Sequence, residues 1–155
     1  MIGKITALTA LAWASLASGV MAAPCDGQNI QGVWKLESIR AAEPGVEAFY
    51  ARVPHEWMRF GADGGFMYVA SNQPKPDLAD VHASLDRADA GDRDDYVVRW
   101  PAPGQMLILR SGQPFQLFQC EILERPEDGA LAGGMVLGST PGAPLLRRVQ
   151  RWIGA

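Results

Sequence analysis

The sequence predicts an all-β protein in which eight short antiparallel strands run up and down and close into a barrel, with one helical insertion. Short apolar segments of strand length follow one another along the chain, and clusters of glycine and proline separate them. Only one segment has the three- and four-residue spacing of apolar side chains that is typical of a helix. An eight-stranded barrel has an interior wide enough for side chains or one small ligand.

The first three predicted strands are residues 33–40, 55–60 and 66–70. Gly32 precedes the first strand, and the Glu-Pro-Gly sequence at 43–45 ends it. The second and third strands flank Gly-Ala-Asp-Gly-Gly at 61–65. Because glycine readily adopts the positive φ angles that a hairpin turn requires, this segment predicts a hairpin.

The other five predicted strands are residues 95–100, 105–110, 115–123, 131–137 and 145–152. Tyr96, Val98 and Trp100 alternate with residues on the opposite face, which is the two-residue period of a strand. Turn sequences rich in glycine or proline stand between these strands, for example Pro-Ala-Pro-Gly at 101–104. Regular strands joined by tight turns favour an antiparallel meander.

Residues 76–90 form the predicted helical insertion. Four apolar residues recur there at intervals of three or four and would share one helix face, namely Leu78, Val81, Leu85 and Ala88. Asp77 is the expected N-cap. Two roles fit such a helix: a lid over the mouth of the barrel, or a cover for one end or one side of the sheet.

Residues 1–22 are predicted to be a signal peptide. Lys4 provides a positive charge, residues 5–20 are uncharged and mostly apolar, and Val20-Met21-Ala22 offers the small residues that a signal peptidase needs. We expect cleavage after Ala22, so that residues 23–155 form one exported domain, in the periplasm or outside the cell. The apolar stretch of ~16 residues is shorter than the ~20 residues of a transmembrane helix, so no membrane-spanning segment is expected.

Charge and cysteine content narrow the function further. The net charge of −3 at pH 7 provides no basic surface for nucleic acid, whose phosphates require one. Cys25 and Cys120 are the two cysteines of the chain, and an exported protein favours a disulfide between them. This bond would close a loop of ~95 residues and stabilise the fold by about 4 kcal/mol in the chain-entropy model. The alternative is two buried free thiols.

Gly32-Val33-Trp34 opens the first predicted strand, and the last one carries Arg147, Arg148 and Arg151. A Gly-x-Trp sequence answered by a C-terminal arginine resembles the lipocalin-like (calycin) barrels of small bacterial secreted and envelope proteins. The resemblance implies that Trp34 packs beneath one of these arginines and closes the bottom of the barrel through a cation–π contact. Arg148 is the first candidate for this role, and Arg151 is the second.

The resemblance also implies a container for a small hydrophobic molecule. Ten residues at strand positions that can face inward are the candidates to line it, namely Trp34, Met58, Phe60, Phe66, Tyr68, Tyr96, Trp100, Leu107, Phe118 and Met135. Methionine and aromatic side chains suit an apolar ligand. In a small barrel such residues more commonly fill the interior as a core, so a filled interior stands beside an open one as an alternative.

The sequence contains no recognisable catalytic or metal-binding motif. His55-Glu56 begins like the zinc-protease sequence His-Glu-x-x-His, but Arg59 occupies its fifth position. With His55 and His82 as the only histidines, a three-histidine zinc site cannot form. The acidic run at 86–95 lacks the ligand pattern of an EF-hand, and Gly-Ser-Thr-Pro-Gly at 138–142 lacks the spacing of a nucleophile elbow.

The sequence therefore predicts no enzyme, metal or cofactor. The expected function is binding of a small hydrophobic molecule inside the barrel. The alternative is a protein-interaction module, such as an inhibitor of an envelope or extracellular hydrolase.

Overall fold

The computed structural model describes residues 21–41, 43, 45–91, 95–124, 133–140 and 145–151. Eight strands of this structure coincide closely with the predicted ones, namely β2 (Gly32–Ala41), β3 (His55–Phe60), β4 (Phe66–Ser71), β5 (Tyr96–Ala102), β6 (Gln105–Arg110), β7 (Gln113–Glu124), β8 (Gly133–Thr140) and β9 (Leu145–Arg151). They form one sheet in the order β4-β3-β2-β9-β8-β7-β6-β5, and every pair in it is antiparallel. The predicted antiparallel β class is therefore confirmed.

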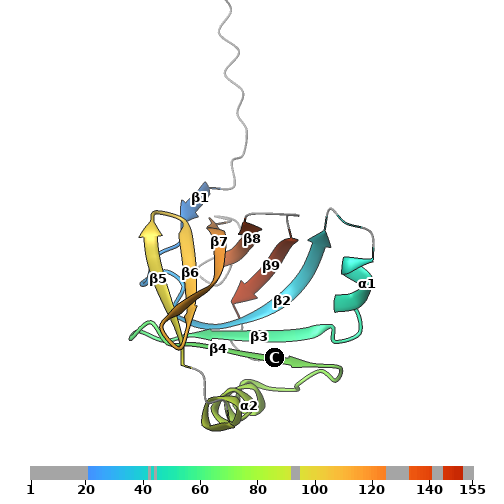
Figure 1. Cartoon of the computed structure of the whole chain (residues 1–155). Helices are drawn as coiled ribbons and strands as arrows, with labels where there is room; N and C mark the ends of the chain where they lie inside the picture. The colour runs from blue at the N-terminus through green and yellow to red at the C-terminus, as the bar shows by residue number, and fades with distance from the viewer. Residues whose placement is uncertain are drawn as a thin grey trace, which may run out of the picture.

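The sheet curls until its two edge strands, β4 and β5, approach each other (Figure 1). Gly65 forms an isolated bridge to Val97, and the Val98 N–H donates a hydrogen bond of 2.8 Å to the Gly64 carbonyl. Gly64 has a φ of 86°, and a Cβ at this position would lie 3.4 Å from the Val98 carbonyl oxygen. Glycine at this turn therefore lets the β3–β4 hairpin lie against β5.

Two short elements were not expected from the sequence. β1 (Met21–Pro24) pairs with β7 and spans the predicted cleavage point after Ala22. α1 (Val46–Tyr50) follows Gly45, whose φ is 89°, on the connection from β2 to β3. A helix of five residues is too short to show a helical period in the sequence, which explains why it was missed.

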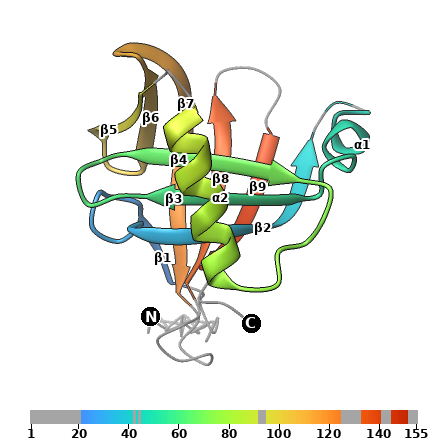
Figure 2. The ribbon, with the colours of Figure 1, turned by 90° about the horizontal axis from the view of Figure 1, so that it is seen from below.

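The predicted helical insertion is α2 (Leu78–Gly91), and it lies across the outer face of the sheet (Figure 2). The Asp77 carboxylate accepts a hydrogen bond of 2.8 Å from the Asp80 N–H, so the expected N-cap is confirmed. Leu85 packs in a separate buried cluster with Trp57, and both are 0% exposed. Arg59 and Asp86 form an ion pair of 2.6 Å between β3 and the helix. α2 therefore covers one side of the sheet, which is the second of its two expected roles.

The main hydrophobic core consists of inward-facing strand residues together with Cys25 and Ile30 from the segment between β1 and β2. Its members are Cys25, Ile30, Trp34, Met58, Phe60, Phe66, Val98, Met106, Ile108, Phe118, Cys120, Ile122, Met135, Leu137 and Val149. The predicted disulfide between Cys25 and Cys120 is present, and both cysteines are 1% exposed. It ties the segment after β1 to β7. Within the described part of the chain, no helix has both the length and the apolar character that crossing a membrane requires.

Candidate functional site

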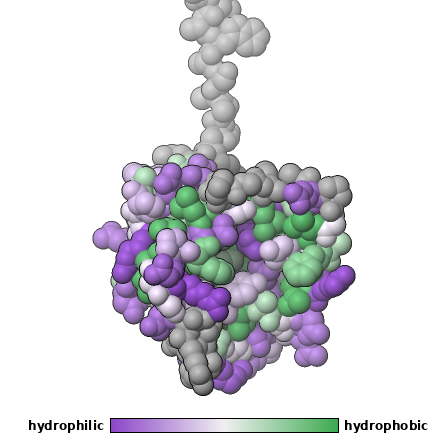
Figure 3. Space-filling model, viewed as in Figure 1, coloured by the Kyte–Doolittle hydropathy of each residue, from purple (hydrophilic) through white to green (hydrophobic). Residues whose placement is uncertain are grey.

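The inner face of the sheet carries a cavity of about 470 Å³, which is within the range of roughly 300–1,000 Å³ found for small-molecule sites. Seen from the side of Figure 1, the surface is hollowed near its centre (Figure 3). The cavity is lined by Tyr50, Met58, Phe66, Met67, Tyr68, Ala88, Tyr96, Met106, Ile108, Phe115, Gln116, Phe118, Leu137, Ser139, Leu145 and Arg147. Because β4 and β5 both contribute to this lining, the cavity borders the seam between the two edge strands.

Five of the ten predicted lining residues do line this cavity, namely Met58, Phe66, Tyr68, Tyr96 and Phe118. Four others belong to the packed core or lie against it, namely Trp34, Phe60, Trp100 and Met135. Leu107 was assigned to the wrong face, because Met106 and Ile108 on either side of it are the inward-facing residues of β6. The interior is therefore partly a filled core and partly an open cavity.

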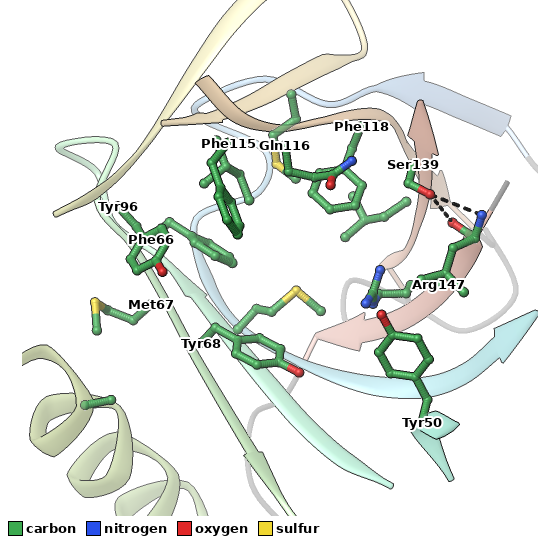
Figure 4. A pocket seen from close by; sticks show the side chains of 16 residues that line it. Tyr50, Phe66, Met67, Tyr68, Tyr96, Phe115, Gln116, Phe118, Ser139 and Arg147 are labelled. Atoms are coloured by element: carbon green, nitrogen blue, oxygen red, sulfur yellow. Dashed lines mark hydrogen bonds between the residues drawn. The ribbon is translucent and has the colours of Figure 1, made fainter. Parts of the chain in front are cut away.

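One end of the cavity is aromatic. The rings of Phe66 and Tyr96 have centroids 6.4 Å apart, and those of Tyr96 and Phe115 are 5.8 Å apart, both in edge-to-face contact (Figure 4). Phe115 reaches this position through a β-bulge, since Ile108 pairs with Gln116 and Leu109 with Pro114, which leaves Phe115 without a partner in the register. At 56% exposure, Phe115 lies at the rim of the cavity.

The opposite end of the cavity is polar, with Arg147, Tyr50 and Ser139 grouped there (Figure 4). Arg147 shares the inward face of β9 with the buried Val149, and its side chain is only 14% exposed. Its guanidinium carbon lies 5.1 Å from the centroid of the Tyr50 ring. Ser139 Oγ accepts a hydrogen bond of 3.1 Å from the Leu145 N–H, so this hydroxyl is held by the backbone of β9.

Glu56 lies next to Arg147, outside the cavity lining, and is only 1% exposed. Its Oε2 atom is 3.6 Å from Arg147 Nε, which is longer than a hydrogen bond, and has no hydrogen-bond partner among the residues that the structure describes. Burial raises the pKa of the Glu56 carboxyl, against the opposing effects of the Arg147 charge and the Tyr68 hydroxyl. Burial and the neighbouring Glu56 carboxylate also raise the pKa of Tyr68.

The contact between Trp34 and a C-terminal arginine is present, but it is made by Arg151. The Arg151 guanidinium lies 4.7 Å from the Trp34 ring and donates hydrogen bonds of 2.7 and 2.8 Å to the carbonyls of Gln31 and Asn29. The Trp34 indole N–H donates to the Ile30 carbonyl at 2.7 Å. Arg148, the first candidate for this contact, was the wrong choice, because the strand register pairs Arg151 with Trp34 and Arg148 with Ser38. The Arg148 side chain lies outside the described residues.

Sequence reasoning missed Glu56, Arg147, Tyr50 and Phe115. The two-residue alternation of side chains along a strand could have identified the first two. Glu56 is two residues from Met58, and Arg147 is four residues from Arg151, so each lies on the same face as that neighbour. No comparable signal marks Tyr50, which comes from the unpredicted α1, or Phe115, which is turned inward by a bulge.

The cavity has aromatic rings at one end and Arg147, Tyr50 and Ser139 at the other (Figure 4), a composition typical of a small-molecule pocket. Within the described residues, no three His, Cys, Asp or Glu side chains lie where they could hold a metal ion together. No protein-family model, no curated protein and no solved structure matches this chain.

Proposed function

We propose that this chain is an exported, lipocalin-like carrier that binds a small, largely hydrophobic molecule inside a barrel formed by β2 to β9. The observation that carries this proposal is the cavity of about 470 Å³ on the inner face of the sheet. Its aromatic and methionine lining offers apolar surface with a few polar groups among it, which is the usual composition of a small-molecule site.

Two contacts support the barrel interpretation. The bridge between Gly65 and Val97 joins the edges of the sheet at one turn. The guanidinium of Arg151 stacks on the Trp34 ring at 4.7 Å and covers one end of the core. Arg147 lies four residues earlier on β9, about 13 Å away at 3.3 Å per residue, so the stacked pair and the polar end of the cavity are at different ends of this strand. Export is supported by the apolar N-terminal sequence and by the buried Cys25–Cys120 disulfide, a bond that persists in oxidising compartments.

The experiment is a binding titration with N-phenyl-1-naphthylamine, a neutral apolar fluorophore, combined with native mass spectrometry of protein purified from its own host. We expect saturable fluorescence enhancement and a retained small molecule. Phe115→Asp should weaken binding of the fluorophore at least ~10-fold, because it brings a charge to the rim of an apolar cavity. Phe49→Asp is the matched control, since Phe49 is 63% exposed and does not line the cavity; affinity should stay within about twofold.

Failure of the fluorophore to bind, together with absence of any retained molecule, would contradict the carrier function. Equal weakening by both aspartate variants would also contradict it, because the effect would then not depend on the cavity. In either case the protein-interaction module becomes the better proposal, and a hydrolase inhibited by the purified protein is the result that would support it.

A further inference from the structure

The polar end of the cavity presents a cation, the guanidinium of Arg147 (Figure 4). Arg147 is 14% exposed, and among the residues that the structure describes its side chain contacts Glu56 at 3.6 Å and the ring of Tyr50 at 5.1 Å. The 3.6 Å separation is long for a hydrogen bond and joins Glu56 to Nε, whereas a guanidinium has five N–H donors. Because the guanidinium lines the cavity, its donors face any bound molecule, and this end of the cavity favours a ligand that supplies acceptors.

Glu56 does not supply those acceptors, although it balances the charge. Its carboxylate lies outside the cavity lining, and Oε2 reaches only the Nε side of Arg147. The guanidinium itself lines the cavity and points into it beside the Tyr50 hydroxyl (Figure 4). A molecule entering the cavity therefore meets Arg147 before it meets Glu56.

We propose, as a refinement that depends on the carrier function above, that the cavity takes an amphipathic oxyanion. Its carboxylate or sulfonate group accepts hydrogen bonds from Arg147 and Tyr50, and its apolar body lies along the rings of Phe118, Phe66 and Tyr96. The two ends of the cavity match such a molecule, because hydrogen bonds between a guanidinium and an oxyanion are charge-assisted and the rings at the aromatic end offer apolar surface. Glu56 acts against this binding, since a second negative charge near Arg147 is repelled.

The test compares octane-1-sulfonate, which is an anion at every working pH, with 1-octanol, which has the same chain and no charge. Each is titrated by calorimetry at neutral pH, and octanoate tests whether a carboxylate serves as well as a sulfonate. We expect octane-1-sulfonate to bind at least ~10-fold more tightly than octanol, as charge-assisted hydrogen bonds imply. Octanoate should follow the sulfonate.

Three variants locate the effect. Arg147→Met should reduce the ratio of sulfonate to octanol affinity to within about twofold of one. Arg99→Met removes the same charge from the outer face of β5, where Arg99 is exposed, and should leave the ratio unchanged. Glu56→Gln should strengthen sulfonate binding at least ~3-fold, because it removes the repelling carboxylate. If Arg147→Met fails to fold with Glu56 left unpaired, the double variant Glu56→Gln/Arg147→Met makes the same comparison without a buried lone charge.

The outcomes separate the two proposals. Equal affinity for sulfonate and octanol, or a preference that survives loss of Arg147, overturns the oxyanion inference and leaves the carrier function standing. Absence of binding by both octyl compounds and by the neutral fluorophore overturns the carrier function, and the inference falls with it.

Discussion

Replacement of Arg151 by methionine should destabilise the protein by about 2–4 kcal/mol. The variant loses a cation–π contact with Trp34 worth about 0.5–2 kcal/mol and two hydrogen bonds from a charged donor, each worth up to about 1.5–3 kcal/mol. The contacts are a ring distance of 4.7 Å and N···O distances of 2.7 and 2.8 Å to the carbonyls of Gln31 and Asn29. The lower values add up to about 3.5 kcal/mol, and we expect about 2–4 kcal/mol because Arg151 is partly exposed and solvent weakens each contact.

The assay is unfolding in guanidinium chloride, followed by tryptophan fluorescence with the disulfide intact. Arg40→Met is the matched control, because its side chain is 78% exposed, and its free energy of unfolding should stay within ~0.5 kcal/mol of the parent. Combining Arg151→Met with Trp34→Leu in a double-mutant cycle isolates the cation–π part, for which we expect a coupling of about 0.5–2 kcal/mol. A change below ~0.5 kcal/mol for Arg151→Met, at an unchanged denaturant slope, would refute the reasoning.

Three further results are expected from the same assay. Cys25→Ala/Cys120→Ala should lower the free energy of unfolding by about 2–5 kcal/mol, and a parent protein that loses nothing on reduction would contradict this. Because burial raises the pKa of Glu56 in the folded state, the folded protein holds this proton more tightly than the unfolded chain, so stability should fall as pH rises from the ordinary glutamate pKa through the raised one. Glu56→Gln should remove that part of the pH dependence; an unchanged profile would show that Glu56 does not titrate this way. Leu85 is fully buried on the face of α2 that packs on the sheet, so Leu85→Ala should lower the free energy of unfolding by about 2–5 kcal/mol. Ala83 is exposed on the same helix, and Ala83→Ser should change that free energy by less than ~0.5 kcal/mol. Similar values for both variants would mean that α2 does not pack on the sheet as described.

The strands could be predicted from the sequence because their turns are explicit. Gly-Ala-Asp-Gly-Gly at 61–65 and Pro-Ala-Pro-Gly at 101–104 set the ends of four strands, and all four end within two residues of the prediction. β1 escaped because Met-Ala-Ala-Pro has neither alternation nor strong strand propensity. Its pairing with β7 is a tertiary contact next to the disulfide, which local sequence does not express.

The candidate site was predictable only where polarity alternates along a strand. Tyr96 was found because it stands in a clear inward and outward alternation, whereas Leu107 was misplaced because Met-Leu-Ile-Leu is apolar on both faces. Residues three apart, such as Arg148 and Arg151, cannot share a face of a regular strand, but Arg147 and Arg151 can. Applying that alternation would have put Arg147 and Arg151 together on the inward face of the last strand.

The hydrogen bonds from Arg151 to the segment at 29–31 also have a consequence for biogenesis. Arg151 holds the backbone at Asn29 and Gln31, positions 122 and 120 residues earlier in the chain. A polypeptide that crosses a membrane amino end first delivers Arg151 last, so the loop that follows Cys25 cannot be locked in place while translocation is still under way. Contacts this distant in sequence slow folding, because the entropy of closing a long loop opposes them. In the exported protein proposed above, the linkage of residues 29–31 to Arg151 would delay completion of the native state until residue 151 has crossed the membrane.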